Sequence, residues 1–138
     1  MSERNDFNQK VITEFRANQG KVGGQMAGMP LLVLTTTGNK TGRTLIKPLA
    51  YTKEGDSIFV IASFAGSPHH PGWFCNLEAN PRVTVEVGAE RYEARARIAS
   101  GEERARLFKL QADKYAIFYD YQKKTSRQLP VVVFERAV

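Results

Sequence analysis

The residues whose types and spacing most suggest chemistry lie in one short segment, Gly38-Asn39-Lys40-Thr41-Gly42-Arg43. Glycines at both ends free the backbone to point N–H groups toward an anion, while the Lys, Thr and Arg side chains add further donors. The segment is not a phosphate-binding P-loop, because the GxxxxGK[ST] spacing is absent, and the chain has no GxGxxG dinucleotide fingerprint. An anion site on a turn is one interpretation, and an exposed hairpin turn whose charges serve solubility is an equally good one.

Basic residues also dominate the stretch around this segment. The chain has 20 Lys and Arg against 14 Asp and Glu, which gives a formal net charge of +6. From Pro30 to Lys53 there is no acidic residue, and the basic ones are Lys40, Arg43, Lys47 and Lys53. The arginine-rich stretch 91–106 is interleaved with glutamates, so its charges neutralise one another. The uncompensated charge therefore sits on one hairpin, which favours a compact anionic ligand over nucleic acid.

The chain has too few of the residues that a metal centre or a Ser-His-Asp triad requires. His69 and His70 are the only histidines, adjacent side chains rarely converge on one ion, and no cysteine or carboxylate cluster accompanies them. We therefore expect no metal site, and the shortage of histidines excludes a Ser-His-Asp triad in any usual arrangement. Cys75 is the only cysteine, so we interpret it as a packing residue, in a chain without an internal disulfide.

The elements that must position these residues belong to a single small domain. The chain has 138 residues, of which 42% are hydrophobic and 25% charged, as in ordinary soluble proteins. No apolar stretch approaches the roughly 18–20 residues of a membrane span, and the polar residues 1–6 do not look like a signal peptide. We expect a cytoplasmic protein with one domain over 1–138, in which 1–29 form a helix and a glycine-rich connector and 30–138 form the main body.

Alternating and β-branched runs predict six strands, at residues 31–37, 44–53, 57–64, 82–87, 92–99 and 131–134. Short turns with glycine separate several of these runs, and the prolines and glycines of 65–72 exclude regular structure there. This pattern predicts a mainly β fold, a small and mostly antiparallel barrel with helices outside it.

Three helices are expected between and before these strands. Residues 6–19 carry apolar residues on one helical face, namely Phe7, Val11, Ile12 and Phe15. A short helix over 73–79 ends before Asn80-Pro81. Ser100 followed by Glu103 predicts a capping box that opens a helix reaching about Lys114.

Three ordered segments together resemble one known family. The first is LTTTGNKTG at 34–42, followed by Pro48-Leu49; the second is Ile61-Ala62-Ser63, then HPGWFCNL at 70–77 and NPRV at 80–83. The third is the aromatic stretch 115–121, followed by RQLPVVV at 127–133. From about Leu31 to its end, the chain resembles the deazaflavin (F420)-dependent nitroreductases. The resemblance implies a split β-barrel of the FMN-binding type, which agrees with the predicted strands.

The resemblance also implies a cofactor, coenzyme F420, whose deazaflavin ring carries a phosphodiester and an oligoglutamate tail. By this resemblance, residues 39–41 would hold the phosphate and tail of F420, and residues 45–50 would line one side of the cofactor. Residues 61–64 and 72–76 would contact its ring. The implied cofactor-binding residues, with Arg43 added, are Asn39, Lys40, Thr41, Arg43, Leu45, Lys47, Pro48, Leu49, Ala50, Ile61, Ala62, Ser63, Phe64, Gly72, Trp73, Phe74, Cys75 and Asn76. Packing in the core is the competing interpretation of Trp73 and Phe74.

The sequence departs from the family pattern at three positions. Many relatives carry an arginine near Leu45, a charge that Lys47 or Arg43 would supply here. A lysine often follows the Ala-Ser pair, where this chain has Phe64. Phe118 occupies the position of the family's first substrate-side tyrosine, which leaves Tyr121 to orient the acceptor or donate a proton. We take Tyr121 and Ser63 as the candidate catalytic residues.

The function that the resemblance implies is hydride transfer from reduced F420 to a flat organic acceptor such as a quinone, nitroaromatic or activated enone. A separate F420-reducing dehydrogenase would be the indirect source of reduced cofactor, and the protein would be a monomer or homodimer. We expect the N-terminal helix to be dispensable for the barrel fold and to shape the acceptor pocket or touch a membrane surface. An FMN- or haem-binding split barrel and a non-catalytic F420 carrier stay open as alternatives.

Overall fold

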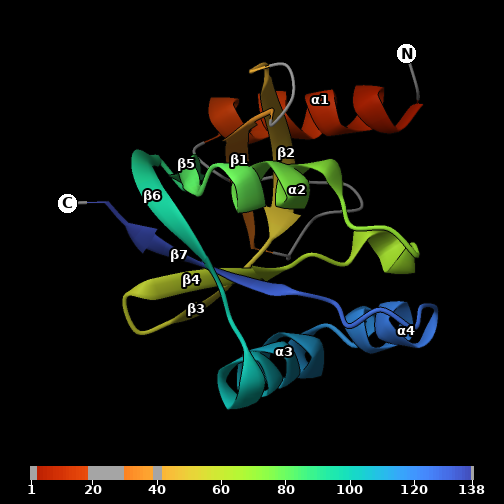
Figure 1. Cartoon of the computed structure of the whole chain (residues 1–138). Helices are drawn as coiled ribbons and strands as arrows, with labels where there is room; N and C mark the ends of the chain where they lie inside the picture. Colours follow the sequence, from red (N-terminus) through yellow and green to blue (C-terminus); the bar gives the residue numbers. More distant parts are fainter. Residues whose placement is uncertain (1–2, 19–29, 39–41, 138) are drawn as a thin grey trace.

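The computed structural model describes residues 3–18, 30–38 and 42–137 (Figure 1). Its order along the chain is α1 (Glu3–Ala17), β1 (Leu31–Thr37), β2 (Thr44–Ala50), β3 (Thr52–Glu54), β4 (Ser57–Ile61), the 3-10 turn η2 (Phe64–Gly66), α2 (Gly72–Ala79), β5 (Arg82–Val87), β6 (Glu90–Ile98), α3 (Gly101–Lys114), α4 (Ile117–Lys123) and β7 (Val131–Arg136).

The strands of the described chain form one antiparallel sheet in the order β2-β1-β5-β6-β7-β4-β3. β2 and β3 stand at opposite ends of this order, yet only Tyr51 separates them in the sequence. One continuous chain can supply both edges only if the sheet curls until they meet. The mainly β, split-barrel architecture expected from the sequence is therefore confirmed.

Alternation along the strands sends apolar side chains to both faces of this curled sheet. Leu32, Leu34, Val60, Val132 and Phe134 point inward and pack with Trp73, Phe74 and Leu77 of α2, which closes the inner core. The outward-facing residues of β4 and β7 lie under α3 and α4, whereas those of β1 lie under α1. Figure 1 shows α1 on one side of the barrel and α3 with α4 on the opposite side.

Two strand predictions differ from the structure. The predicted strand 44–53 is divided at Tyr51 into β2 and β3, so there are seven strands instead of six in the described chain. The predicted strand 57–64 ends at Ile61, because Ser63 N–H bonds back to Ile61 O and Phe64 takes a positive φ of 45°. The aromatic stretch after Tyr115 adds a short helix, α4, that the sequence pattern did not predict.

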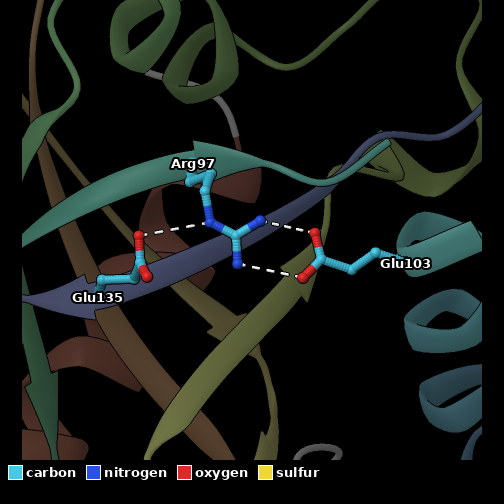
Figure 2. Close-up of polar contacts among 3 residues, drawn as sticks. All are labelled: Arg97, Glu103 and Glu135. Carbon is cyan, nitrogen blue, oxygen red and sulfur yellow. Dashed lines mark hydrogen bonds and ion pairs between the residues drawn. The ribbon is translucent and has the colours of Figure 1, made fainter. Parts of the chain in front are cut away.

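The helix α3 forms as expected, but not through the expected capping box. Ser100 is the N-cap residue and makes no side-chain capping hydrogen bond. Glu103 instead accepts two hydrogen bonds from Arg97 of β6, at 2.6 and 3.2 Å, as Figure 2 shows. Arg97 also donates to Glu135 of β7 at 3.4 Å. A bidentate ion pair across elements thus takes the carboxylate that a local cap would have used.

The helix α1 packs into the core of the structure, whereas the sequence led us to expect a helix that is dispensable for the barrel fold. Val11, Ile12 and Phe15 are 7%, 3% and 1% exposed and pack with the outward-facing residues of β1. Arg16 donates two hydrogen bonds, at 3.0 and 2.8 Å, to Glu86 of β5, a residue only 7% exposed. These apolar side chains face the barrel, and none of the described helices is long and apolar enough to cross a membrane.

Candidate functional site

One face of the edge strand β2 carries a lysine between two leucines. Leu45, Lys47 and Leu49 pair with Thr36, Leu34 and Leu32 of β1, and residues paired across strands share a face. Leu45 and Leu49 pack against the inner core, so Lys47 lies on the same side of the strand. Its side chain is half-buried and forms no hydrogen bond or ion pair with any residue that the structure describes. A half-buried cation without a protein anion suits an anionic ligand.

The first turn of α2 lies beside this face. A Cβ placed on Gly72 would be 3.6 Å from Cδ2 of Leu45, so the glycine leaves an open strip of backbone next to the leucine. Asn76 fixes the helix, because its side-chain amide donates to the Thr36 hydroxyl of β1 at 3.1 Å in a buried position. The structure therefore brings together residues of β2 and α2 that the sequence analysis assigned to the cofactor.

The side chains of α2 differ in what they could touch. Trp73 and Phe74 are 5% and 3% exposed, and they pack in the inner core as the competing interpretation expected. Cys75, by contrast, is exposed. A ligand on this helix would therefore meet the backbone of Gly72 and the side chain of Cys75 before it met either aromatic ring.

After β4 the chain turns sharply through the segment predicted to contact the ring. Ile61 and Ala62 are 4% and 0% exposed as whole residues, so the protein itself encloses both. Ser63, one of the two candidate catalytic residues, is half-buried. Phe64 is 36% exposed and belongs to η2. Half-buried Ser63 and the Phe64 ring therefore form the accessible surface that follows β4.

The helix α4 packs against this turn and brings Tyr121 to it. A Cβ on Gly66 would lie 2.8 Å from the Tyr121 carbonyl oxygen, so α4 and η2 are in close contact. The Tyr121 ring is half-buried, stands edge-on to Phe118 with centroids 5.8 Å apart, and has Lys124 Nζ 5.7 Å from its centroid. Its hydroxyl makes no hydrogen bond within the described residues, which leaves that donor available to a substrate.

A residue that the sequence analysis mentioned only as part of a motif holds this turn in place. The Arg127 guanidinium donates to the carbonyl oxygens of Ser63 and Ser67 at 2.8 Å each and of Ala62 at 3.2 Å, and it contacts Nδ1 of His70 at 3.0 Å. Burial lowers the pKa of Arg127 below its ordinary value. Only the position of Arg127 just before a buried strand could have drawn attention to it in the sequence.

The glycine-bounded segment that opened the sequence analysis is only partly described. Asn39, Lys40 and Thr41 lie outside the described residues. At its ends, Gly38 N–H donates to Arg43 O at 2.6 Å, Gly42 N–H donates to Gly38 O at 3.1 Å, and Gly42 has a φ of +71°. Arg43 is exposed at the start of β2. The Arg43 guanidinium therefore lies immediately before the strand that carries Lys47.

The two histidines do not meet other metal-binding side chains. Across residues 3–18, 30–38 and 42–137 no group of three His, Cys, Asp or Glu residues could hold a metal ion. His70 stacks near Phe74, with ring centroids 4.8 Å apart, in addition to its contact with Arg127. Because a guanidinium can only donate, His70 Nδ1 is the acceptor in this contact.

Comparison with known proteins identifies the family. The model of the F420H(2)-dependent quinone reductase family matches residues 8–136. An F420H(2)-dependent quinone reductase of Mycobacterium tuberculosis is 38% identical over 126 residues, covering 88% of this chain and 85% of the relative.

Two solved structures share both sequence and fold with the chain. One, described as an F420-H2 dependent reductase, is 38% identical with a TM-score of 0.71, covering 77% of this chain and 94% of its own. The other, described as a domain-swapped dimer, is 35% identical with a TM-score of 0.73, and the match covers 96% of this chain and 100% of that structure's chain. The family model spans β1, β2, α2 and the C-terminal segment, the elements that build the site described above. The chain therefore belongs to the F420H(2)-dependent quinone reductase family.

Proposed function

We propose that this protein binds reduced coenzyme F420 and reduces a quinone with it. The observation that carries the proposal is the face of β2, where half-buried Lys47 lies between Leu45 and Leu49 beside the open backbone of Gly72. A flat ring with an anionic tail needs both an apolar strip and an uncompensated cation, and this face offers both. The family name supplies the identity of the cofactor and of the acceptor class.

Bound there, reduced F420 supplies a hydride to the acceptor. The contributions of the protein are binding, orientation and exclusion of water. Lys47 and Arg43 would bind the anionic part of the cofactor, while Leu45, Gly72 and Ser63 would support its ring. Tyr121 would donate a hydrogen bond from its phenol to a quinone oxygen, where negative charge develops.

Two further expectations belong to this proposal. Each turnover oxidises one reduced cofactor, so a separate F420-reducing dehydrogenase would have to supply it again. We also infer a homodimer, because the relative that is 35% identical is described as a domain-swapped dimer. The membrane contact expected for α1 is not carried forward, since Val11, Ile12 and Phe15 are buried against the barrel.

The binding half of the proposal is tested by titrating the protein with F420 and, in parallel, with FMN. Trp73 is the only tryptophan and lies next to Gly72, so its fluorescence reports on the site. We expect F420 to quench it saturably and FMN to bind much more weakly. Tight FMN binding without F420 binding would contradict the cofactor assignment.

A further inference from the structure

Arg127 makes an unusual set of contacts for one side chain, because all four of its partners lie in the single segment 62–70. Three of the four are carbonyl oxygens, on Ala62, Ser63 and Ser67. Arg127 forms no ion pair with a described carboxylate, so its donors are committed to this backbone. A planar guanidinium with several fixed donors is suited to holding a loop in one shape.

The loop that Arg127 holds is strained. Phe64 has a φ of 45°, and it is the one residue other than glycine with positive φ in the described chain. The left-handed region costs a bulky L-residue about 1–2 kcal/mol, so surrounding contacts must impose it. The carbonyl just before Phe64, on Ser63, and the one that follows η2, on Ser67, are both bound by Arg127.

The strained shape has a consequence for the surface of the site. Ala62 is fully buried, whereas two residues later the Phe64 side chain is 36% exposed. Gly66, with a φ of +78°, packs the far side of the turn against α4, where a Cβ would lie 2.9 Å from Lys124 Cβ. The turn is thus fixed from two sides, by Arg127 and by α4, with Phe64 on its outer surface.

We propose that Arg127 is a positioning residue for the hydride transfer: it holds the 62–70 loop in the strained shape that presents Ser63 and Phe64 to the flat cofactor and acceptor. It does so without touching either molecule. The inference rests on the proposed function, because that function makes this loop part of the site. The ordering of the loop by Arg127 can be tested apart from that function, since it does not require a bound ligand.

Arg104 offers a matched control. It too is a partly buried arginine whose pKa is lowered by burial, and it donates to the Leu129 carbonyl oxygen at 2.7 and 3.2 Å and to Gln122 Oε1 at 3.2 Å. It lies over the Phe108 ring at 4.6 Å and makes no described hydrogen bond to the 62–70 loop. Arg104→Gln therefore removes a similar group from α3, whose partners Gln122 and Leu129 lie in the segment that carries Arg127, without removing any bond to the 62–70 loop.

The experiment compares Arg127→Gln, Arg104→Gln and the wild type by two readouts. The first is the Kd for F420 from Trp73 fluorescence, with kcat and KM for a soluble quinone. The second, made without cofactor, is hydrogen exchange at the Gly66 and Ser67 amides, which close the turn by bonding to Ser63 O and Phe64 O at 2.9 Å each. We expect Arg127→Gln to raise the Kd and lower kcat by at least about tenfold, and to speed both amides by about tenfold or more.

Arg104→Gln should lower Tm but leave the Kd and the exchange of both amides within about twofold of wild type. If Arg127→Gln does not fold, Arg127→Lys serves in its place, because one ammonium cannot reach all four partners and should give a smaller effect of the same kind. Wild-type binding and exchange in the Arg127 variant, or equal changes in both variants, would overturn the inference. A wild type that binds no F420 would instead overturn the proposed function and the catalytic role with it, while the exchange data would still show whether Arg127 orders the loop.

Discussion

Lys47 is the residue on which the anion-binding part of the account depends. It is half-buried on the face of β2 that carries Leu45 and Leu49, and no described residue neutralises it. Keeping an ammonium there without a partner costs free energy, which a bound anion would recover. We therefore expect the Lys47 side chain to bind the anionic part of the ligand.

Replacing Lys47 with alanine should weaken F420 binding by at least about tenfold, because a charge-assisted hydrogen bond is worth about 1.5–3 kcal/mol. The Kd from Trp73 fluorescence measures this, and added salt should weaken the wild type more than the variant. Lys53→Ala, at an exposed position of β3, is the control and should change the Kd by less than about twofold. Equal affinity of Lys47→Ala and the wild type at low salt would remove Lys47 from the site.

Tyr121 is the residue that we expect to contact the acceptor. Its half-buried ring lies on the helix that packs against η2, and its hydroxyl has no hydrogen-bond partner among the residues that the structure describes. Tyr121→Phe should lower turnover by about ten- to hundredfold, since a lost donor to a developing oxyanion costs at least this much in enclosed sites and less in open ones. F420 affinity should hardly change.

Tyr119→Phe is the matched control for this measurement. Tyr119 lies on the same helix, but its hydroxyl donates to Asp113 at 2.6 Å, away from the loop. Steady-state kinetics with several quinones should show wild-type turnover for this variant. If Tyr121→Phe is equally active with every quinone tried, Tyr121 has a packing role only.

At the scale of elements, α1 shows how tertiary contacts decide what a local pattern leaves open. Phe15 is 1% exposed, and Phe→Ala in a core typically costs 3–5 kcal/mol, so Phe15→Ala should lower the free energy of unfolding by about that much. Urea denaturation followed by circular dichroism measures the change. Lys10→Ala on the exposed side of the helix should stay within about 0.5 kcal/mol of wild type. An unchanged midpoint for Phe15→Ala would restore the expectation that α1 is dispensable.

Local patterns predicted most strands and helices because alternation and turn residues act within a few positions. They missed features that depend on distant partners. The break at Tyr51 arises because β2 and β3 belong to opposite edges of a curled sheet, and β4 ends at Ile61 where Arg127 binds the next two carbonyls. The capping box failed for the same reason, since Arg97 of β6 binds Glu103.

The sequence proposed a residue set for the candidate site but not its geometry. Resemblance gathered Leu45, Lys47 and Gly72, and the structure places Leu45 and Gly72 in contact range. It could not tell that Trp73 and Phe74 are buried, because an aromatic next to a glycine suits a core and a ligand equally well. Arg127 escaped because nothing local distinguishes an arginine that binds backbone carbonyls from one that faces solvent.

For the whole molecule, we expect a dimeric assembly. Light scattering behind size-exclusion chromatography should give twice the chain mass of 15.5 kDa. This expectation rests on the 35% identical relative, which is described as a domain-swapped dimer. It also rests on α1, whose buried side chains pack against β1 although the two elements are separated in the sequence. A mass of one chain at micromolar concentration and above would show that the dimer does not extend to this protein.

The central claim is that this chain passes a hydride from reduced F420 to a quinone, and an anaerobic single-turnover experiment tests it most directly. Protein loaded with reduced F420 is mixed rapidly with a soluble quinone, and the return of oxidised F420 is followed by its absorbance. The account predicts a fast phase that requires the protein, forms one hydroquinone per cofactor oxidised, and slows in the Tyr121→Phe variant. A rate equal to that of free reduced F420 with the same quinone would contradict the account.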